Sequence, residues 1–488
     1  MIGIMTHCLL WLDICPIFPC MASELFSSHV SLQFMGAAGM VTGSKHLLRT
    51  PDMNILVDCG LFQGLKNLRQ LNRDPIRVSP ATIQVLIITH AHLDHTGYLP
   101  VLFKNGFSGP VYLTTPTRSL TEIILLDSAK LQEEDAEHAN KMGYSKHKPA
   151  IPLYTQQDVK KTFGHMQSCG EGEWMELSLN IRFRFRKNGH ILGSAFVEMD
   201  CFEKRIVFPG DLGRQKSYTL APPAIPEKAD YLIIESTYGD RVHPPVSPEK
   251  DLAEIIHQVI QKKGNLLIPS FAVGRAQDLM LLIGGLKKKN MIPDIPVYLD
   301  SPMGIEATRV YEQNRDWHKL STEQCNEMWK QIIPVKDLKD TFKVIATPGS
   351  KIIIAASGML TGGRVLHYLH SYVGHHQNTI LLAGYQAVGT RGRALKTGVN
   401  EIKLFGSYHK VKAEVKEMLT LSAHADQQEL LNWMKSIPGR PERVFIVHGE
   451  PEASNALELK INDILGWKSA IPALNEQVEL FKPITTQV

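Results

Sequence analysis

The sequence is poor in cysteine, has no long apolar run and shows no excess of either charge. Its seven cysteines are scattered and odd in number, and none forms a Cys-x-x-Cys pair, which argues against a disulfide framework and against a thiolate zinc site. A reducing compartment such as the cytoplasm is therefore expected. No stretch holds the roughly 18 uninterrupted apolar residues that a membrane-spanning helix needs, so no membrane contact is expected.

The charge balance excludes a whole-molecule attraction to nucleic acid. The 53 basic and 49 acidic residues give a net charge of +4 without a basic tail, so any preference for a polyanion must be local. The apolar fraction of 43% is ordinary for a folded globular protein. The length allows roughly two to four domains.

The first twenty residues are apolar but do not match a signal peptide. They contain no Lys or Arg ahead of the apolar run, Asp13 interrupts that run, and no small-x-small cleavage pattern follows. We expect residues 1–21 to be a non-functional or alternative-start extension ahead of Met21.

The pattern of apolar residues changes along the chain. The first half predicts short strands with tight turns, and one long helix at residues 116–143. Beyond Glu235, strands alternate with helices at a spacing that predicts βαβ units on a mainly parallel sheet. The last segment, residues 422–449, predicts one helix and one strand. The predicted strands are residues 30–36, 45–50, 54–60, 84–90, 181–190, 195–200, 205–211, 231–237, 265–270, 295–300, 351–358 and 379–385.

The densest group of potential ligands is THAHLDH, residues 89–95, directly after an apolar strand. It is either a polar turn that closes the strand or a metal-binding loop. In extended geometry His90 and His92 leave the same face and could hold one ion together. Asp94 and His95 follow at a turn, which suits a second ion. No packing role asks for four ligating groups in six residues, so we favour metal.

Two ions need more ligands than one loop provides. His190 in KNGHILGSA, Asp211 in FPGDLG and His448 in FIVHGE each follow a predicted strand and stand beside a glycine that allows close approach of backbone and ion. Each alone could be an ordinary Gly-His or Gly-Asp turn. Their joint occurrence with the histidine loop favours a metal site.

Seven segments, in order, resemble the motifs of a known family. LVDCG, THAHLDH, GHILGSA and PGDLG resemble the four signature segments of the metallo-β-lactamase fold. IESTYGD, SAHAD and VHGE resemble the three further motifs of its β-CASP branch, the nucleic-acid nucleases. The resemblance implies an α/β fold in which a four-layer αββα metallo-β-lactamase domain carries an inserted β-CASP domain, a parallel sheet flanked by helices. The corresponding ranges are 22–237 and 423–488 for the first domain, and 238–422 for the insertion.

The same resemblance implies the roles of single residues. It implies two Zn²⁺ per chain, one bound by His90, His92, His190 and Asp211. The second would be bound by Asp94, His95, His448 and a bridging Asp211. Asp58 would orient ligands and the attacking water. Glu235 would hold His424, the general acid. The expected catalytic residues are therefore His424, Glu235, Asp94 and Asp58.

Substrate contacts are expected on glycine-rich turns. AASGMLTGGR places Ser357 and Gly358 between a strand and a helix, where free backbone N–H groups can accept an anion, although a plain connection is the alternative. Arg275 begins a predicted helix and would line the substrate cleft. Arg391, Arg393 and Lys396 are predicted to contact phosphates from a flexible loop. His367 and His370 lie at i, i+3 on a helix outside all family motifs, so we do not expect them to bind metal.

The leading functional hypothesis is a zinc-dependent ribonuclease that hydrolyses single-stranded RNA, as an endonuclease, a 5′-3′ exonuclease or both. Two metals would activate a hydroxide, and His424 would protonate the leaving oxygen. His448 favours RNA, because DNA-repair members of the family typically carry valine there. The resemblance is to short bacterial and archaeal relatives of the cleavage and polyadenylation endonuclease. The alternatives are a small-thioester hydrolase of the same fold, a β-CASP DNA nuclease and a non-catalytic binding subunit; a homodimer is compatible with the sequence.

Overall fold

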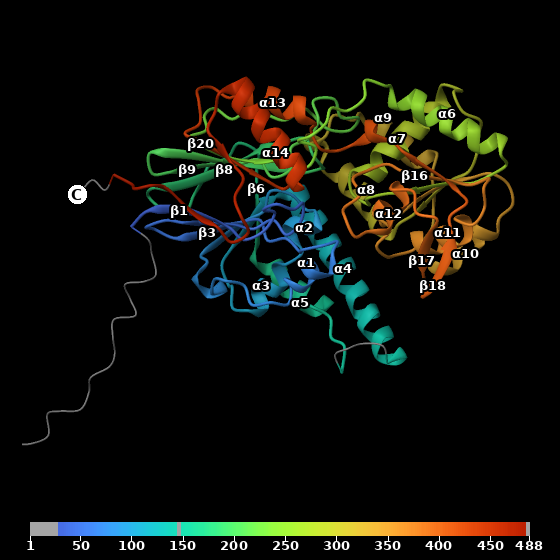
Figure 1. Ribbon diagram of the computed structural model, residues 1–488, viewed down its shortest axis with the longest axis horizontal. Coiled ribbons are helices and arrows are strands. Elements are labelled where there is room, and N and C mark those ends of the chain that lie inside the picture. The colour runs from blue at the N-terminus through green and yellow to red at the C-terminus, as the bar shows by residue number, and fades with distance from the viewer. Residues whose placement is uncertain (1–27, 144–147, 485–488) are drawn as a thin grey trace, which may run out of the picture.

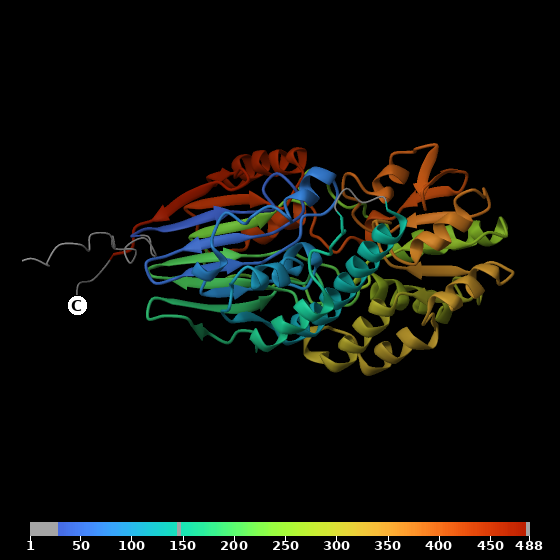
Figure 2. The same ribbon diagram turned by 90° about the horizontal axis from the view of Figure 1, so that it is seen from below.

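The computed structural model describes residues 28–143 and 148–484 of the chain. The predicted extension at residues 1–21 lies outside the described residues. Figures 1 and 2 show two lobes side by side, the first with the blue, green and red segments and the second with the yellow and orange ones. None of the helices in the described part is both long enough and apolar enough to cross a membrane.

The first lobe contains two seven-stranded sheets. In the first sheet the strand order is β22 (Gln477–Phe481), β1 (Val30–Phe34), β2 (His46–Arg49), β3 (Asn54–Val57), β4 (Val85–Ile87), β5 (Val111–Thr114) and β6 (Met166–Cys169). In the second sheet it is β21 (Ser469–Ala470), β20 (Arg443–Val447), β11 (Tyr231–Glu235), β10 (Lys204–Phe208), β9 (Ala195–Cys201), β8 (Ile181–Lys187) and β7 (Met175–Glu176). Strand β22, the last among the described residues, therefore pairs with β1, the first among them, in antiparallel register.

The two sheets pack face to face and helices cover their outer faces. Apolar side chains from β1, β3 and β4 meet those of β8, β9 and β10 in one buried cluster. Helices α3 (Leu99–Lys104), α4 (Thr115–Met142) and α5 (Gln156–Thr162) cover the first sheet, and α13 (Gln427–Lys435) and α14 (Pro451–Lys460) cover the second. The layers run from the red helices down to the blue ones in Figure 1. Strands such as β3 and β11 are buried along their whole length because both of their faces are covered.

The second lobe is built on a six-stranded parallel sheet. Its order is β14 (Ile333–Pro334), β13 (Val297–Asp300), β15 (Ile352–Ala355), β12 (Leu266–Pro269), β16 (Thr379–Leu382) and β19 (Glu414–Glu417). Apolar clusters lie on both of its faces. The helices that cover it are α6 (Pro248–Gln261), α7 (Arg275–Lys288), α8 (Pro302–Gln313), α9 (Thr322–Lys330), α10 (Leu338–Ala346) and α11 (Val365–Tyr372). The predicted fold class is thus confirmed, including the parallel sheet flanked by helices.

One local prediction was wrong. Residues 391–396 form the helix α12 (Arg391–Lys396) rather than a flexible loop, because Thr390 caps its first turn by accepting the backbone N–H of Arg393. The helix and the strand predicted within residues 422–449 are present as α13 and β20, and α14, β21 and β22 follow them. A hairpin of β17 (Glu401–Leu404) and β18 (Ser407–Lys410) also stands apart from the parallel sheet.

Helix α4 links the two lobes. It runs out of the first lobe and its side packs against α8 of the second, as Figure 2 shows. The segments after β4, β10 and β11 meet the second lobe, where His92 contacts Phe271, Arg214 lines a pocket with Arg275, and Tyr238 contacts Tyr385. The residues that follow these strands are those singled out as potential ligands.

Candidate metal centre

The histidine loop follows β4, but its geometry differs from the expected extended strand. The strand ends at Ile87, and His92 is already the N-cap of the short helix α2 (Leu93–Thr96), which carries Asp94 and His95. The side chains of His90 and His92 converge because the chain turns between them, with His90 Nε2 3.2 Å from His92 Nδ1. The expectation that they share one strand face was wrong, although they do meet.

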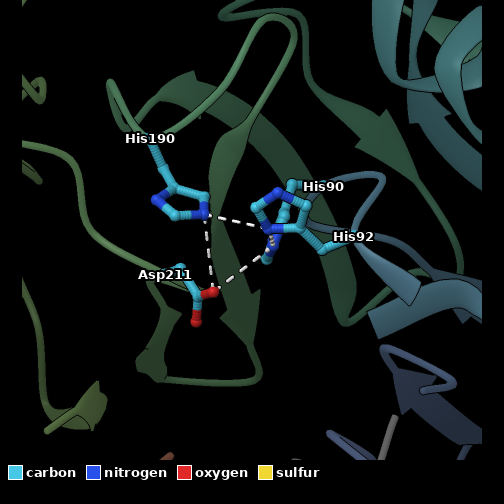
Figure 3. A group of neighbouring side chains, drawn as sticks. All are labelled: His90, His92, His190 and Asp211. Atoms are coloured by element: carbon cyan, nitrogen blue, oxygen red, sulfur yellow. Dashed lines mark hydrogen bonds and ion pairs between the residues drawn. The ribbon is translucent and has the colours of Figure 1, made fainter. Parts of the chain in front are cut away.

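Four buried or half-buried side chains converge on one point, as Figure 3 shows: His90, His92, His190 and Asp211. His92 Nδ1 lies 3.1 Å from His190 Nε2. The Oδ2 atom of Asp211 lies 3.4 Å from His90 Nε2 and 3.6 Å from His190 Nε2. One carboxylate oxygen and three imidazole nitrogens therefore face a common centre.

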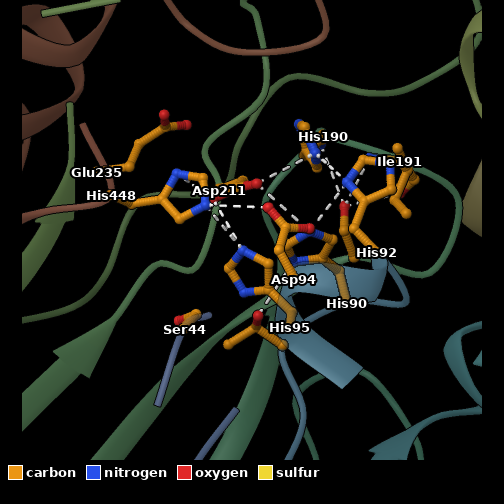
Figure 4. A network of polar contacts seen from close by, with 12 residues as sticks. Ser44, His90, His92, Asp94, His95, His190, Ile191, Asp211, Glu235 and His448 are labelled. Atoms are coloured by element: carbon orange, nitrogen blue, oxygen red, sulfur yellow. Dashed lines mark hydrogen bonds and ion pairs between the residues drawn. The ribbon is translucent and has the colours of Figure 1, made fainter. Parts of the chain in front are cut away.

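A second group of Asp94, His95 and His448 lies on the other side of Asp211. His95 Nε2 is 3.2 Å from His448 Nε2, which is 3.5 Å from Asp94 Oδ2. The other oxygen of Asp211, Oδ1, lies 3.4 Å from His95 Nε2. Asp211 thus presents one oxygen to each group, and Figure 4 shows it between them.

These distances suit divalent cations better than direct hydrogen bonds. A tetrahedral zinc ion with ligands at about 2.0–2.1 Å separates its ligand atoms by about 3.3 Å, close to the spacing in both groups. Asp211 Oδ1 is buried and lacks a hydrogen-bond partner in the described part of the chain. A donor set of imidazoles and carboxylates also matches the preference of zinc. The residues present therefore fit a metal pair.

The electrostatics of the first group favour neutral imidazoles and an ionised carboxylate. Burial lowers the pKa of His92 to about 3 and that of His190 well below its ordinary value. Burial alone would raise the pKa of Asp211, but the charges of His448 and His95 hold it well below the ordinary value. Neutral imidazoles with free lone pairs beside a carboxylate are ready to bind a cation.

Asp58 positions His95 through the ring nitrogen that does not face the second group. The Asp58 Oδ2 atom accepts the His95 Nδ1–H at 2.7 Å, which leaves Nε2 as the nitrogen facing the second group. Thr89 in turn holds Asp58, since its backbone N–H donates to Oδ1 at 2.8 Å. Asp58 and His448 have positive φ angles of 61° and 51°, a conformation that costs a non-glycine residue about 1 kcal/mol or more. Strain at both residues is typical of a functional site.

Sequence reasoning missed two supporting residues. Thr237 Oγ1 lies 3.1 Å from His448 Nδ1 and also donates to the His448 carbonyl oxygen at 3.1 Å. Asn188 Nδ2 donates to the carbonyl oxygens of Pro209 and Asp211 at 2.8 and 2.9 Å, which fixes the loop that carries Asp211. Both residues lie inside quoted motifs, but their contacts join segments far apart in the sequence.

Glu235 and His424 form a separate buried pair beside the first group. His424 Nδ1 lies 3.1 and 3.0 Å from the two carboxylate oxygens of Glu235, whose Oε1 also accepts the Leu212 N–H at 2.7 Å. The ring of His424 lies 4.5 Å from that of His190 between centroids. Burial lowers the pKa of His424, but the charge of Glu235 outweighs it and raises the pKa to about 9. The pair therefore keeps a proton available at neutral pH.

The predicted substrate residues lie on the second lobe, in different environments. Arg275 is buried beside His190, in a pocket that Arg214 and Lys216 also line. Its Nη1 pairs with Asp278 at 3.1 Å, while its Nε has no hydrogen-bond partner among the residues described. A basic pocket so close to the metal ligands can accept an anion.

Of the predicted pair Ser357 and Gly358, only Gly358 packs near the metal centre, where it contacts Phe271. A side chain at Gly358 would meet the Phe271 ring at 2.8 Å, and this ring lies 6.2 Å from that of His92. The hydroxyl of Ser357 is already used within its own turn, where it accepts the Thr361 N–H at 3.1 Å. Of the pair, the structure gives Gly358 a packing role near the site.

The guanidinium groups of Arg391 and Arg393 are held by protein oxygens. Arg391 donates to the carbonyl oxygens of Lys403, Leu360 and Thr361 at 2.9 to 3.2 Å. Arg393 donates to the Gln386 carbonyl at 3.3 Å and lies 3.8 Å from a Glu450 carboxylate oxygen. Both arginines hold α12 against its neighbours. Their guanidinium groups are therefore less available to bind phosphate than they would be in the predicted flexible loop.

A further group, His243, Asp426 and Glu429, has the composition of a metal site. Its carboxylates are already engaged, because Asp426 and Glu429 form the capping box of α13 and Asp426 Oδ2 accepts the His243 N–H at 2.7 Å. The group therefore serves to start a helix.

Comparison with known proteins places this geometry in a family. Family models match residues 42–165 as metallo-β-lactamase superfamily, 276–395 as Beta-Casp domain and 408–472 as Zn-dependent metallo-hydrolase RNA specificity domain. The chain is 34% identical over 429 residues to Ribonuclease TTHA0252 of Thermus thermophilus, covering 86% of this chain and 94% of that protein. The chain belongs to the β-CASP branch of the metallo-β-lactamase superfamily.

Other relatives agree with this assignment. Transcription termination factor FttA of Pyrococcus abyssi is 34% identical over 481 residues, with 92% of this chain and 71% of that protein covered. A crystal structure of a protein of unknown function from Enterococcus faecalis matches 93% of this chain and all of its own, with a TM-score of 0.53 at 12% identity. The last likeness concerns the fold alone. The β-CASP chain is thus a metallo-hydrolase by fold and by relationship.

Proposed function

We propose that this β-CASP protein is a two-zinc ribonuclease that hydrolyses phosphodiester bonds of single-stranded RNA, as an endonuclease, a 5′-3′ exonuclease or both. The observation that carries the proposal is the division of Asp211 between two groups of ligands, with the Glu235–His424 pair beside them. Two adjacent cation sites suit phosphate chemistry, in which both the attacking and the leaving oxygen carry negative charge. The Thermus relative named as a ribonuclease supports RNA as the substrate.

In this proposal His90, His92, His190 and Asp211 hold one zinc, and Asp94, His95, His448 and Asp211 hold the other. When bound, two such cations offset the charge of the phosphodiester and activate water at neutral pH. Asp58 fixes the tautomer of His95 and thereby the position of its Nε2. Asp94, as a member of the second group, would contact the attacking water as well as the cation.

His424 supplies the proton that the leaving oxygen needs. Glu235 occupies Nδ1 of His424, so the transferable proton is on Nε2. An alkoxide leaves slowly without a proton, and the raised pKa of His424 keeps it protonated before the bond breaks. The products are then a 5′-phosphate and a 3′-hydroxyl.

The two lobes divide the work in this proposal. Residues 22–237 and 423–488 form the catalytic domain, because all strands of its two sheets come from these ranges. Residues 238–422 form the domain that covers the substrate, through the pocket at Arg275 and the turn at Gly358. A hydrolase of small thioesters has no use for so large a cover, which makes it the weaker alternative.

Metal analysis combined with digestion tests the proposal. We expect two zinc ions per chain and cleavage of unstructured single-stranded RNA, with single-stranded DNA of the same sequence cleaved more slowly. Sizing the products from 5′-phosphorylated and 5′-hydroxylated RNA distinguishes internal cleavage from 5′-3′ digestion. Protein without metal, or protein that hydrolyses thioesters and no RNA, would contradict the proposal.

The cytoplasm is the compartment we propose for this enzyme. Cys59, Cys169, Cys201 and Cys325 are free and buried, as a reducing environment allows. We take a homodimer as the assembly to test, by sedimentation of the zinc-loaded chain.

A further inference from the structure

An exposed aromatic surface lies on the second lobe, apart from the metal ligands. It consists of side chains from α10, α11 and the β17–β18 hairpin, which Figure 1 shows side by side: Phe342, His367, His370, Phe405, Tyr408 and His409. Phe342 is 50%, Phe405 58% and Tyr408 69% exposed. We call these six residues the aromatic surface.

Five of the six rings contact one another, whereas Tyr408 faces its cross-strand partner Lys403 on the other face of the hairpin. His367 and Phe405 stack with 5.1 Å between centroids and 28° between planes. Phe342 meets the edge of His367 at 5.2 Å, and His370 meets His409 at 4.7 Å. Ring faces that are held in place and open to solvent are suited to stack on flat ligands.

Phe405 occupies a position that turn geometry alone would not give to a phenylalanine. It and Gly406 form the two-residue turn of the hairpin, with φ angles of 47° and 88°. Such turns favour asparagine, aspartate or glycine, because a bulky side chain is strained at positive φ. A strained and solvent-exposed aromatic residue indicates a function other than holding the turn.

The surroundings of the aromatic surface are basic. The hairpin and the two residues after it contain Lys403, Lys410 and Lys412, with Glu401 as the one acidic residue of that segment, 401–412. Lys403 Nζ lies 5.7 Å from the centroid of the Tyr408 ring. On α10, Lys339 is exposed, and Lys343 pairs with Asp340 at 2.7 Å. Aromatic faces among lysines match the chemistry of an unpaired polynucleotide, with bases to stack and phosphates to neutralise.

A continuous series of contacts joins the aromatic surface to the metal centre. The His92 ring faces Phe271, and Phe271 packs against Gly358 in the glycine-rich turn. Arg391 Nη1 then donates to the carbonyl oxygens of Leu360 and Thr361 at the end of that turn. Its Nε donates to the carbonyl oxygen of Lys403 in the hairpin. The hairpin is therefore fixed to the same turn that packs beside the metal ligands.

We propose that the aromatic surface binds unpaired bases of a single-stranded RNA whose scissile phosphate lies at the metal centre. This inference rests on the proposed ribonuclease function and adds a second contact with the same strand. Stacking on rings is tolerant of base identity, so the surface selects unstructured and sufficiently long RNA rather than a sequence.

Phe405→Asn is the variant that tests the surface. Asparagine removes the ring and suits the positive φ, so the hairpin is expected to keep or gain thermal stability. Affinity is measured by fluorescence anisotropy in zinc-loaded His424→Ala protein, so that the RNA survives the titration. For an unstructured RNA of about twenty nucleotides we expect binding about 5- to 150-fold weaker, and for one of about four nucleotides little change.

Two further variants sharpen the test. Tyr408→Ser removes another exposed ring without touching the turn, and should weaken binding of the long RNA in the same direction. Leu179→Asn is the matched control, because Leu179 is fully exposed on the first lobe, and its loss should leave RNA affinity unchanged.

The possible results separate the two proposals. If the wild-type protein cleaves no RNA, the ribonuclease function fails and this inference fails with it. If the wild-type protein cleaves RNA, and adding Phe405→Asn or Tyr408→Ser to the His424→Ala protein leaves its affinity for the long RNA unchanged, the function stands and the inference is overturned. The aromatic surface would then serve a partner of another class, such as a protein.

Discussion

Asp211 is the residue on which both halves of the metal centre depend. Its Oδ2 faces His90 and His190 and its Oδ1 faces His95, so the variant Asp211→Ala removes a ligand from each group at once. We expect this variant to bind fewer than two zinc ions per chain and to lose activity on RNA. Elemental analysis of the purified protein measures the first effect, and full metal occupancy would contradict the bridging role.

His424 should separate catalysis from metal binding. His424→Ala is expected to keep both zinc ions and to lose about 10²- to 10⁴-fold in the rate of RNA cleavage, the usual contribution of a general acid. A p-nitrophenyl phosphodiester has a leaving group that needs no proton, so its hydrolysis should fall much less. Equal losses on RNA and on the activated ester would show that His424 acts in some other way.

The ligand residues were predictable because their chemistry is dense in the sequence, with two histidines, an aspartate and another histidine within residues 90–95. The residues that hold these ligands in position were not predictable. Thr237 and Asn188 act through hydrogen bonds to His448 and to the Asp211 loop, and threonine and asparagine are too common in turns for their presence to predict such a role. Arg391 was predicted as a phosphate contact, whereas its side chain is occupied by three carbonyl oxygens.

At the scale of elements, the four-residue helix α2 depends on a glycine in the neighbouring turn. A Cβ at Gly60 would meet the Asp94 carbonyl oxygen at 1.5 Å and the His95 nitrogen at 2.7 Å, both of them backbone atoms that cannot rotate away. We expect Gly60→Ala to displace α2, to weaken zinc binding by Asp94 and His95, and to destabilise the fold by about 1–3 kcal/mol. Chemical denaturation and metal analysis measure these effects.

Gly285→Ala is the control for that substitution. Gly285 lies within α7, where an added Cβ meets nothing within 4 Å, so alanine should stabilise the helix by up to about 1 kcal/mol. Full zinc occupancy and unchanged stability in Gly60→Ala would contradict the prediction that the position of α2 depends on Gly60.

Elements were predictable where burial dictates the sequence. Strands such as β12 and β15 are covered on both faces, and each reads as an unbroken apolar run. Helices α9 and α10 were not predicted, although their buried residues recur at helical spacing, because each is only nine residues long and so presents few repeats of the apolar period. Helix α12 was mistaken for a loop because its glycine and its charged residues mask the cap at Thr390.

At the scale of the whole molecule, the metal centre joins parts of the chain that are remote in sequence. His90 follows the first sheet, whereas His190, Asp211 and His448 follow strands of the second. Cations held by these residues would therefore tie the two sheets of the first lobe together at the end that faces the second lobe. Sequence motifs in order could predict this assembly only through family resemblance, since no local pattern specifies which strand ends meet.

This arrangement predicts that metal removal destabilises the protein as a whole. Ligands from both sheets assemble only in the folded chain, so zinc would bind the native state and would stabilise it by about 2.7 kcal/mol at a free concentration of 100 times the dissociation constant. Removing zinc with a chelator should lower the melting temperature by a few degrees, and added zinc should restore it. The Asp211→Ala protein should melt at nearly the same temperature with and without zinc. A wild-type melting temperature that does not change, although metal analysis shows that the zinc has been removed, would contradict a centre that links the two sheets.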